Sequence, residues 1–313
     1  MSRALCLLLT VLSGAVPRAA ASPPGSSEAQ EPLPRNQPFR FGVGVDAVTL
    51  DVVVTDNKAR FVEGLKKEDF LVLEEGVAQE LTFFTSVITP VTVLVLLDAS
   101  SSIRSSLEAI QKASGRFVRR LRPGDQARVG YFHERVIFGP RFTDLTREHV
   151  LIIRGILPRG NTLLYDAVLA SLGELSAVPD RKALLVLSDG DDAGSVASEQ
   201  EMLEGARRAD VAIYTVGFQG WSPVKGDDIN RELLARLAAE TGGRAYFPPN
   251  EVEMVKSFDQ IQDELHRQYR MAYTPQKSPQ GAAWRRIEVR AARRKDVTVR
   301  TRVGYFGRID RGR

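Results

Sequence analysis

The chain has 313 residues, of which 43% are hydrophobic and 26% charged, so it has the composition of a folded protein with a sizeable core and not of a disordered chain. Its only cysteine, Cys6, lies near the start of the sequence, which excludes a fold held together by intramolecular disulfides. The formal net charge is +4, but the basic residues are unevenly spread, with eleven Arg or Lys and three acids in residues 281–313.

The first segment resembles a secretory signal. Arg3 precedes an apolar run from Ala4 to about Val16, and small residues follow at Ala19 to Ala21, where a signal peptidase would cut. An uncleaved anchor is the alternative, but the run is shorter than the roughly 18 to 20 residues that span a bilayer. We predict a signal peptide at 1–21, a Pro- and Ser-rich disordered linker at 22–40, no further membrane span, and export to the periplasm or the extracellular space of a bacterium.

Two β segments are predicted on either side of a central region. Residues 41–88 contain the strand-like stretches VTLDVVVTD, DFLVLEEG and QELTFFTS, with a turn at Glu75-Gly76. In residues 267–308 arginines alternate with apolar residues, which favours a solvated strand face over a nucleic-acid-binding patch. Neither segment has enough strands to be stable alone, so we predict that they pair in a small β-sandwich-like unit with the central domain inserted between them.

The central region, residues 89–266, alternates apolar strands with amphipathic helices. Strands are expected at 91–97, 127–132, 182–188 and 211–218, and helices at 103–121, 163–175, 199–209 and 229–241. Strands that are apolar on both faces and alternate with helices predict an α/β fold with a doubly wound, mainly parallel sheet. In such sheets ligands bind beyond the carboxyl ends of the strands.

Polar residues stand at those strand ends. Asp98 ends the strand VTVLVLL, Asp189 follows the strand KALLVLS, and Thr162 lies in a Gly-containing loop before a helix. Each also has a structural alternative, because Asp98, Ser102 and Thr162 could cap the helices that follow and Asp189 could simply form a turn.

These residues carry a resemblance. Asp98-Ala99-Ser100-Ser101-Ser102 resembles the DxSxS signature of von Willebrand factor type A domains, and GNTLLYDA and LSDGDD resemble that family's threonine and second-aspartate loops, in the same order. The flanks, including LDVVVTDNKARFVEGLKKEDFLVLEEGVAQELTFF, YRMAYTP and VRTRVGYFGR, are similar to the bacterial secreted "VWFA-related" proteins.

The resemblance implies a metal-ion-dependent adhesion site. Its ligands would be Asp98, Ser100, Ser102, Thr162 and Asp189, and its cation Mg²⁺ or Mn²⁺. Three of these ligands are uncharged, so the cation keeps residual charge that an Asp or Glu of a protein partner can satisfy. We therefore predict an exported adhesion-type binding module with no catalytic residues and no nucleic-acid partner. Asp191 and Asp192 are expected to support the site or to be merely solvated.

Two other functions stay open. The first is a structural scaffold in the envelope, and the second, weaker one is a metal-dependent hydrolase. The sequence has no nucleotide-binding loop and no nucleophile elbow, and His133, His149 and His266 lack the spacing of a zinc site. Residues 219–228, with Trp221, follow a strand at the same sheet edge and are expected to help select the partner.

Overall fold

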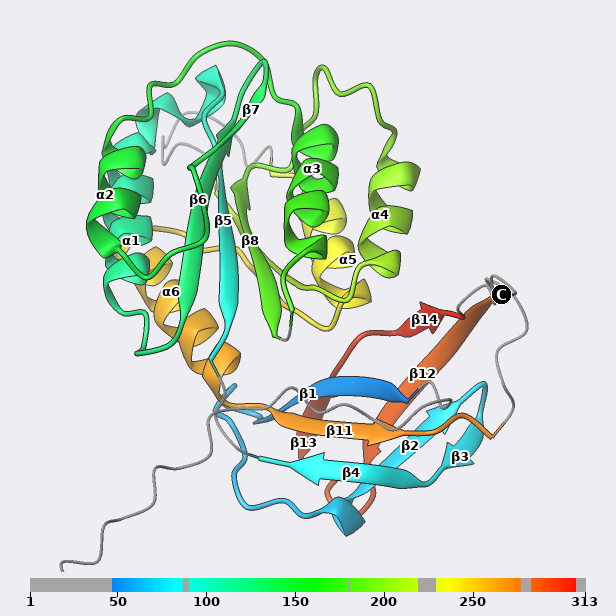
Figure 1. The fold of residues 1–313 in the computed structure, drawn as a ribbon. Coiled ribbons are helices and arrows are strands. Elements are labelled where there is room, and N and C mark those ends of the chain that lie inside the picture. The colour runs from blue at the N-terminus through cyan, green and yellow to red at the C-terminus, as the bar shows by residue number, and fades with distance from the viewer. Residues whose placement is uncertain (1–46, 87–89, 180, 219–228, 277–282, 308–313) are drawn as a thin grey trace, which may run out of the picture. The chain divides into compact units, whose positions relative to one another are not determined.

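The computed structural model describes residues 47–86, 90–179, 181–218, 229–276 and 283–307 (Figure 1). The predicted signal peptide and linker, and the segment 219–228 with Trp221, lie outside the described residues. All the described residues belong to one unit of the chain, residues 41–313. None of the described helices is both long enough and apolar enough to span a bilayer.

A six-stranded sheet forms the centre of the α/β part, in the order β10-β9-β8-β5-β6-β7. Its strands are β5 (Thr92–Asp98), β6 (Gln126–Phe132), β7 (Val136–Phe138), β8 (Lys182–Ser188), β9 (Ala212–Gly217) and β10 (Ala245–Tyr246). All neighbours are parallel except β6 and β7. The doubly wound, mainly parallel α/β fold is therefore confirmed.

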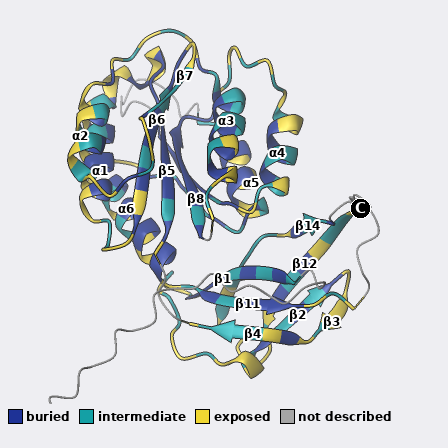
Figure 2. Ribbon diagram, viewed as in Figure 1, coloured by how far each residue is buried: buried dark blue, intermediate teal, exposed yellow. Residues whose placement is uncertain are grey.

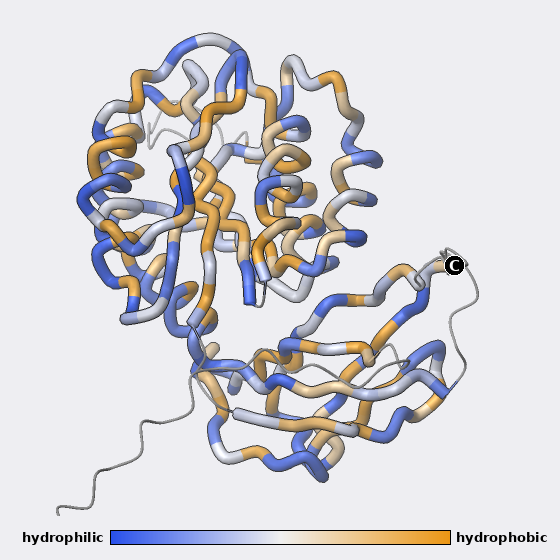
Figure 3. The backbone as a smooth tube through the Cα atoms, in the orientation of Figure 1, coloured by the Kyte–Doolittle hydropathy of each residue, from blue (hydrophilic) through white to orange (hydrophobic). Residues whose placement is uncertain are grey.

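Helices cover both faces of this sheet (Figure 1). On one face α1 (Leu107–Arg119), α2 (Thr146–Arg154) and α6 (Glu251–His266) share a core that includes Phe117, Ile153 and Phe258. On the other face α3 (Leu164–Ser176), α4 (Glu199–Arg208) and α5 (Arg231–Glu240) share a second core. Figure 2 shows β5 and β8 almost entirely buried, and Figure 3 shows the same strands as hydrophobic, because each needs apolar side chains on both faces.

The helix predicted at 103–121 is divided. A 3₁₀ segment, η2 (Ser101–Ser105), precedes α1. The elements α2, α6, β7 and β10 were not predicted.

The order of the strands determines where a ligand can bind. From β5 the chain winds outward to β6, and then returns to the opposite side of β5 to form β8, β9 and β10. The winding direction therefore reverses between β5 and β8. In open α/β sheets the crevice at this reversal, beyond the carboxyl ends of the strands, is where ligands bind. Asp98 and Asp189 follow these two strands.

The flanking segments form two further antiparallel sheets, ordered β13-β1-β11-β4 and β14-β12-β2-β3. From the N-terminal side come β1 (Val48–Asp56), the 3₁₀ segment η1 (Lys67–Asp69), β2 (Phe70–Glu74), β3 (Val77–Gln79) and β4 (Leu81–Thr85). From the C-terminal side come β11 (Tyr269–Tyr273), β12 (Trp284–Ala291), β13 (Val297–Arg300) and β14 (Gly304–Phe306). Each sheet mixes strands of both segments, which confirms the predicted shared β unit.

One buried carboxylate joins the two segments inside this unit. Glu74 of β2 is 4% exposed and accepts hydrogen bonds from the hydroxyls of Tyr273 at 2.7 Å and Tyr305 at 3.0 Å. It also forms an ion pair with Arg285 at 2.6 Å. All three partners come from the C-terminal segment. The next two residues, Glu75 (φ 49°) and Gly76 (φ 78°), form the tight turn that the sequence predicted.

The basic C-terminal segment follows the expected alternation. In β12, Ile287 and Val289 are buried, whereas Arg286 and Arg290 are exposed. These arginines therefore lie on the solvated side of a strand, as its period of two predicts.

Candidate metal centre

Asp98 is the last residue of β5 and is completely buried. Its Oδ1 accepts a hydrogen bond from the amide of Ser100 at 2.8 Å, and its Oδ2 accepts one from the hydroxyl of Ser188 at 2.9 Å. Ser188 ends the neighbouring strand β8. The carboxylate is thus oriented by its own loop and by the next strand of the sheet.

Two serine hydroxyls lie side by side just after Asp98. Ser100 Oγ and Ser102 Oγ are 2.9 Å apart, with Ser100 buried and Ser102 exposed. A hard cation such as Mg²⁺ takes uncharged oxygens of this kind as ligands. The pair therefore places two oxygen donors between a buried carboxylate and the solvent.

The remaining predicted ligands come from two other loops. Thr162 and Asp189 are 7% and 4% exposed. The amide of Ala193, in the Asp189 loop, donates to the carbonyl of Thr162 at 3.0 Å, and the amide of Ser101 donates to the carbonyl of Gly160 at 3.2 Å. Backbone hydrogen bonds thus join all three loops into one rim that carries the five predicted ligands.

Two glycines allow these loops to approach closely. Gly160 has a φ of 65°, and a Cβ there would lie 2.5 Å from Cγ of Glu134. Gly190 has a φ of 87°, and its Cβ would lie 3.0 Å from the carbonyl oxygen of Asn230, the residue that caps α5. Both positions need the left-handed conformation and the missing side chain that only glycine offers without strain.

The electrostatics of the rim favour a cation. The pKa of Asp98 is raised to about 6, mainly by burial and also by the nearby charge of Asp189, against the lowering effect of the hydrogen bonds from Ser100 and Ser188. Among the described residues, no basic side chain forms an ion pair with Asp98 or Asp189. Buried charges in proteins are normally paired with an opposite charge or bound to a metal. The donor set of two carboxylates and three hydroxyls fits a hard divalent cation.

The alternative role of Asp98, Ser102 and Thr162, as caps of the helices that follow them, is not seen in the structure. No side-chain cap bond is present at the start of η2, α1 or α3, so Asp98, Ser102 and Thr162 do not act as caps there. Asp189 Oδ1 does accept from the amide of Asp191 at 3.2 Å, which is the hydrogen bond of a local turn. That bond occupies one oxygen of Asp189 and leaves the other without a hydrogen bond among the described residues.

Two neighbouring acids support the loops. Asp192 accepts from the amide of Tyr165 at 3.1 Å and from the hydroxyl of Ser195 at 2.6 Å, so it ties the Asp189 loop to the start of α3. Asp166 accepts from the amides of Val196 and Ala197. Asp191 is exposed. No group of three or more His, Cys, Asp or Glu side chains gathers as a metal site in the part of the chain described, as expected for a site with two acids.

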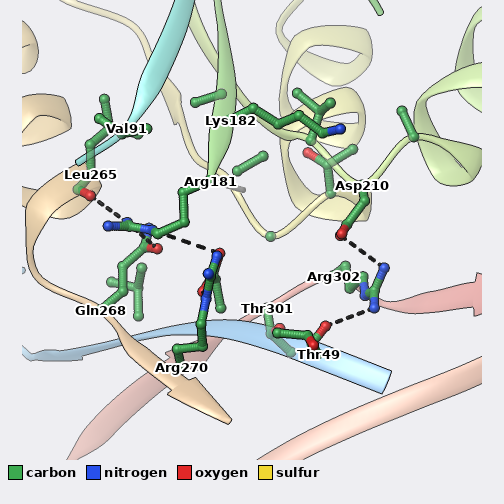
Figure 4. A pocket seen from close by; sticks show the side chains of 18 residues that line it. Thr49, Val91, Arg181, Lys182, Asp210, Leu265, Gln268, Arg270, Thr301 and Arg302 are labelled. Carbon is green, nitrogen blue, oxygen red and sulfur yellow. Dashed lines mark hydrogen bonds and ion pairs between the residues drawn. The ribbon is translucent and has the colours of Figure 1, made fainter. Parts of the chain in front are cut away.

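A cavity of about 60 Å³ lies elsewhere, near the start of β8 (Figure 4). Its polar groups bond to one another, for example Arg181 to the carbonyl of Leu265 and Arg302 to Asp210 at 3.0 Å. These contacts indicate a structural role, and the cavity includes none of the predicted ligands.

Comparison with known proteins identifies the fold. No family model and no curated protein matches the chain. Among solved structures, a von Willebrand factor type A protein from Catenulispora acidiphila matches 85% of this chain and 75% of its own, with a TM-score of 0.51 and 12% identity. The chain has a von Willebrand factor type A fold. This similarity covers more of the sequence than the α/β part alone, but at this identity it establishes the fold only.

Two other similar structures match a smaller share of this chain. The vWF domain of the type V pili tip protein Mfa5 from Porphyromonas gingivalis is 13% identical over 58% of this chain and 98% of its own, with a TM-score of 0.47. BatB from Bacteroides thetaiotaomicron is 16% identical over 56% of this chain and 98% of its own, with a TM-score of 0.45.

Proposed function

We propose that this protein is an exported binding module whose type A domain holds Mg²⁺ or Mn²⁺ and captures an Asp or Glu carboxylate of a protein partner. The observation that carries the proposal is the buried Asp98, which has no ion pair among the described residues, with Asp189 close by and the hydroxyls of Ser100 and Ser102 beside it. When bound, a divalent cation would supply a Lewis-acidic coordination position for that carboxylate.

Each residue has a separate task in this proposal. Asp98 and Asp189 supply the negative charge that retains the cation, directly or through water. Ser100, Ser102 and Thr162 supply neutral oxygens, which leave the charge of the cation only partly neutralised. Ser188 holds Asp98 in place through the hydrogen bond to Oδ2. The incoming carboxylate then completes the neutralisation, so binding requires both the cation and the partner's acid.

A scaffold role is the second candidate, and the hydrogen bonds of Asp98 favour it. Its two oxygens already accept from the amide of Ser100 and the hydroxyl of Ser188, so the buried carboxylate has polar partners without a cation. Hydrolysis has less support. His133 lies beside the rim but is only 2% exposed, and its Nδ1 accepts from the amide of Glu134 at 2.7 Å.

A capture experiment separates adhesion from the scaffold role. Envelope extract is passed over the immobilised protein with Mg²⁺ or with chelator, and captured proteins are identified. Thr162→Ala and Ser100→Ala should lose the Mg²⁺-dependent proteins while keeping the wild-type Tm in chelator, because each removes one hydroxyl at a loop rim. Ser101→Ala is the matched control. It removes a serine hydroxyl between Ser100 and Ser102, and the proposal gives that hydroxyl no role. Capture that is equal with chelator, or equal in all variants, would support the scaffold.

A further inference from the structure

Three exposed arginines lie in loops near the predicted metal ligands. Arg104 lies in η2, two residues after Ser102, and is exposed. Arg135 lies in the turn between β6 and β7, and Arg159 lies three residues before Thr162; both are exposed. Each therefore belongs to a loop at the carboxyl end of the sheet, where the predicted ligands also lie.

Hydrogen bonds place two of these arginines near one another and near Asp98. The amide of Arg159 donates to the carbonyl of Ala99 at 3.0 Å, next to Asp98. The side chain of Arg159 contacts His133 with 3.4 Å between Nε and Nε2, and the carbonyl of Arg135 accepts from the amide of His133 at 3.2 Å. His133 is thus a buried link between the two basic residues.

Both arginines act electrostatically on His133. The pKa of His133 is lowered by burial first and then by the charges of Arg159 and Arg135, against the opposing effect of Glu134. The exposed acids of these loops are Glu134 and Asp191, whereas Asp98 and Asp189 are buried at the candidate metal centre and Asp192 is half-buried. In the described part of the chain, Arg104, Arg135 and Arg159 form no ion pair. Arginines elsewhere do, such as Arg285 with Glu74 at 2.6 Å and Arg207 with Glu240 at 2.7 Å.

Two exposed apolar side chains belong to the same loops. Leu157, two residues before Arg159, is 75% exposed, and Val196, in the Asp189 loop, is 96% exposed. Single exposed apolar residues are common on protein surfaces. Leu157 shares its loop with Arg159, and Val196 shares its loop with Asp189, so the rim has both apolar and basic exposed side chains, which suits a polypeptide better than a uniformly polar polyanion.

From this juxtaposition we infer that the partner segment is acidic over several residues, so that one carboxylate reaches the metal centre while neighbouring carboxylates pair with Arg135 and Arg159. This inference rests on the proposed function and specifies the chemical class of its partner. Arg104, in η2 next to the predicted ligand Ser102, has a supporting role as a third exposed basic side chain. The arginines would select among carboxylate-bearing segments by charge, since rim charges act mainly on specificity and association rate.

The test uses three fluorescent peptides with blocked ends and the same Gly, Ser and Leu background. The first has a single Asp, the second has that Asp with two added Glu, and the third has only the corresponding amides. Affinity for the purified protein is measured by fluorescence anisotropy in Mg²⁺ and in chelator. The triacidic peptide should bind more tightly than the monoacidic one by about five- to tenfold, because each exposed ion pair contributes up to about fivefold. The gain should shrink at high salt.

Variants of the arginines test whether these side chains cause the tighter binding of the triacidic peptide. In Arg135→Gln/Arg159→Gln the ratio between the triacidic and monoacidic affinities should fall towards one. Arg147→Gln is the matched control, because Arg147 is an exposed arginine without an ion pair in the described structure. It lies at the start of α2, where the hydroxyl of Thr146 bonds to Val118 near the end of α1, far along both helices from the metal loops. The control should keep the wild-type ratio.

The outcomes separate the two proposals. An unchanged ratio in the double variant, or an equal fall in Arg147→Gln, overturns the basic-rim inference while Mg²⁺-dependent binding of the monoacidic peptide still supports the metal centre. A ratio that depends on Arg135 and Arg159 but not on Mg²⁺ supports the rim and contradicts the metal centre. No binding by any peptide contradicts both. Stronger, arginine-dependent binding of a sulfated oligosaccharide or an oligonucleotide would replace the acidic peptide with another class of ligand.

Discussion

The hydroxyl of Ser188 donates a hydrogen bond of 2.9 Å to Oδ2 of Asp98, and so connects the ends of two adjacent parallel strands. The same hydroxyl accepts from the amide of Gly190 at 3.1 Å, in the loop that carries Asp189. One buried serine thus positions both acids of the candidate metal centre.

Ser188→Ala should therefore lower stability and metal affinity together. Removing the hydroxyl leaves the buried Oδ2 of Asp98 and the amide of Gly190 without a partner, at a cost of about 1 to 3 kcal/mol in the free energy of unfolding. Urea denaturation with and without Mg²⁺ measures both effects. Ser105→Ala, at an exposed serine, is the control. Equal stability of Ser188→Ala and wild type would show that the bond contributes nothing.

Asp98→Asn should separate folding from metal binding. The amide keeps the shape of the side chain, and its Oδ1 can still accept from the amide of Ser100, while its Nδ2 would donate to Ser188 Oγ in place of the bond that Oδ2 accepts. It removes a buried charge close to Asp189. Without metal, the variant should be more stable than wild type at neutral pH by about 1 to 3 kcal/mol. With Mg²⁺ present, the wild type should gain up to about 2.7 kcal/mol at a hundredfold excess over the dissociation constant, and the variant should gain nothing. A metal-induced rise in Tm of equal size in both proteins would contradict this.

A second buried pair should govern stability in acid. His266 Nε2 lies 2.8 Å from Oδ2 of Asp125, and both residues are about 1 to 2% exposed. Burial alone would raise the pKa of Asp125, but the hydrogen bonds from His266 and from the amides of Arg122 and Val91 outweigh it, and the pKa is lowered. A lowered folded-state pKa means that the stabilisation is fully present above the ordinary value of 3.8 and is lost as the pH falls through the folded-state value.

Urea denaturation between about pH 5 and pH 2 measures this loss. Asp125→Asn should be less stable than wild type by about 3 kcal/mol at neutral pH, and its stability should fall less steeply in acid. If the two proteins lose stability in parallel over this range, Asp125 is not the group responsible.

Glu74 should be needed for the β unit. Glu74→Ala would leave the buried side of Arg285 without its acid and the hydroxyls of Tyr273 and Tyr305 without their acceptor. Breaking a buried pair in this way costs about 3 to 5 kcal/mol. Glu68→Ala, at an exposed acid of η1, is the control. If Glu74→Ala unfolds at the same urea concentration as the wild type, the contacts of Glu74 with Arg285, Tyr273 and Tyr305 are not needed for the stability of the β unit.

Much of the fold could be predicted because its signals are local. The strands β5 and β8 are continuous apolar runs, and the turn at Glu75-Gly76 has the glycine that its backbone needs. Helix α6 was missed although Met254, Phe258, Ile261 and Leu265 recur at helical spacing, so its signal is present in the sequence.

The supporting residues of the site could not be predicted in the same way. Ser188 meets Asp98 only because β5 and β8 pair in parallel with Leu97 opposite Leu187. Arg159 meets His133 only because two loops far apart in the sequence converge. Such contacts depend on the register of the sheet and on loop packing, and no local pattern of residue types encodes them.

Calorimetric titration of Mg²⁺ and Mn²⁺ into the purified, chelator-treated protein tests the central claim most directly. We predict one site per chain in the wild type and in Ser101→Ala, weaker binding in Ser100→Ala, Ser102→Ala and Thr162→Ala, and none in Asp98→Asn. A wild type that binds no divalent cation, or an Asp98→Asn variant that binds as tightly as the wild type, would contradict the claim that this strand end is a metal centre.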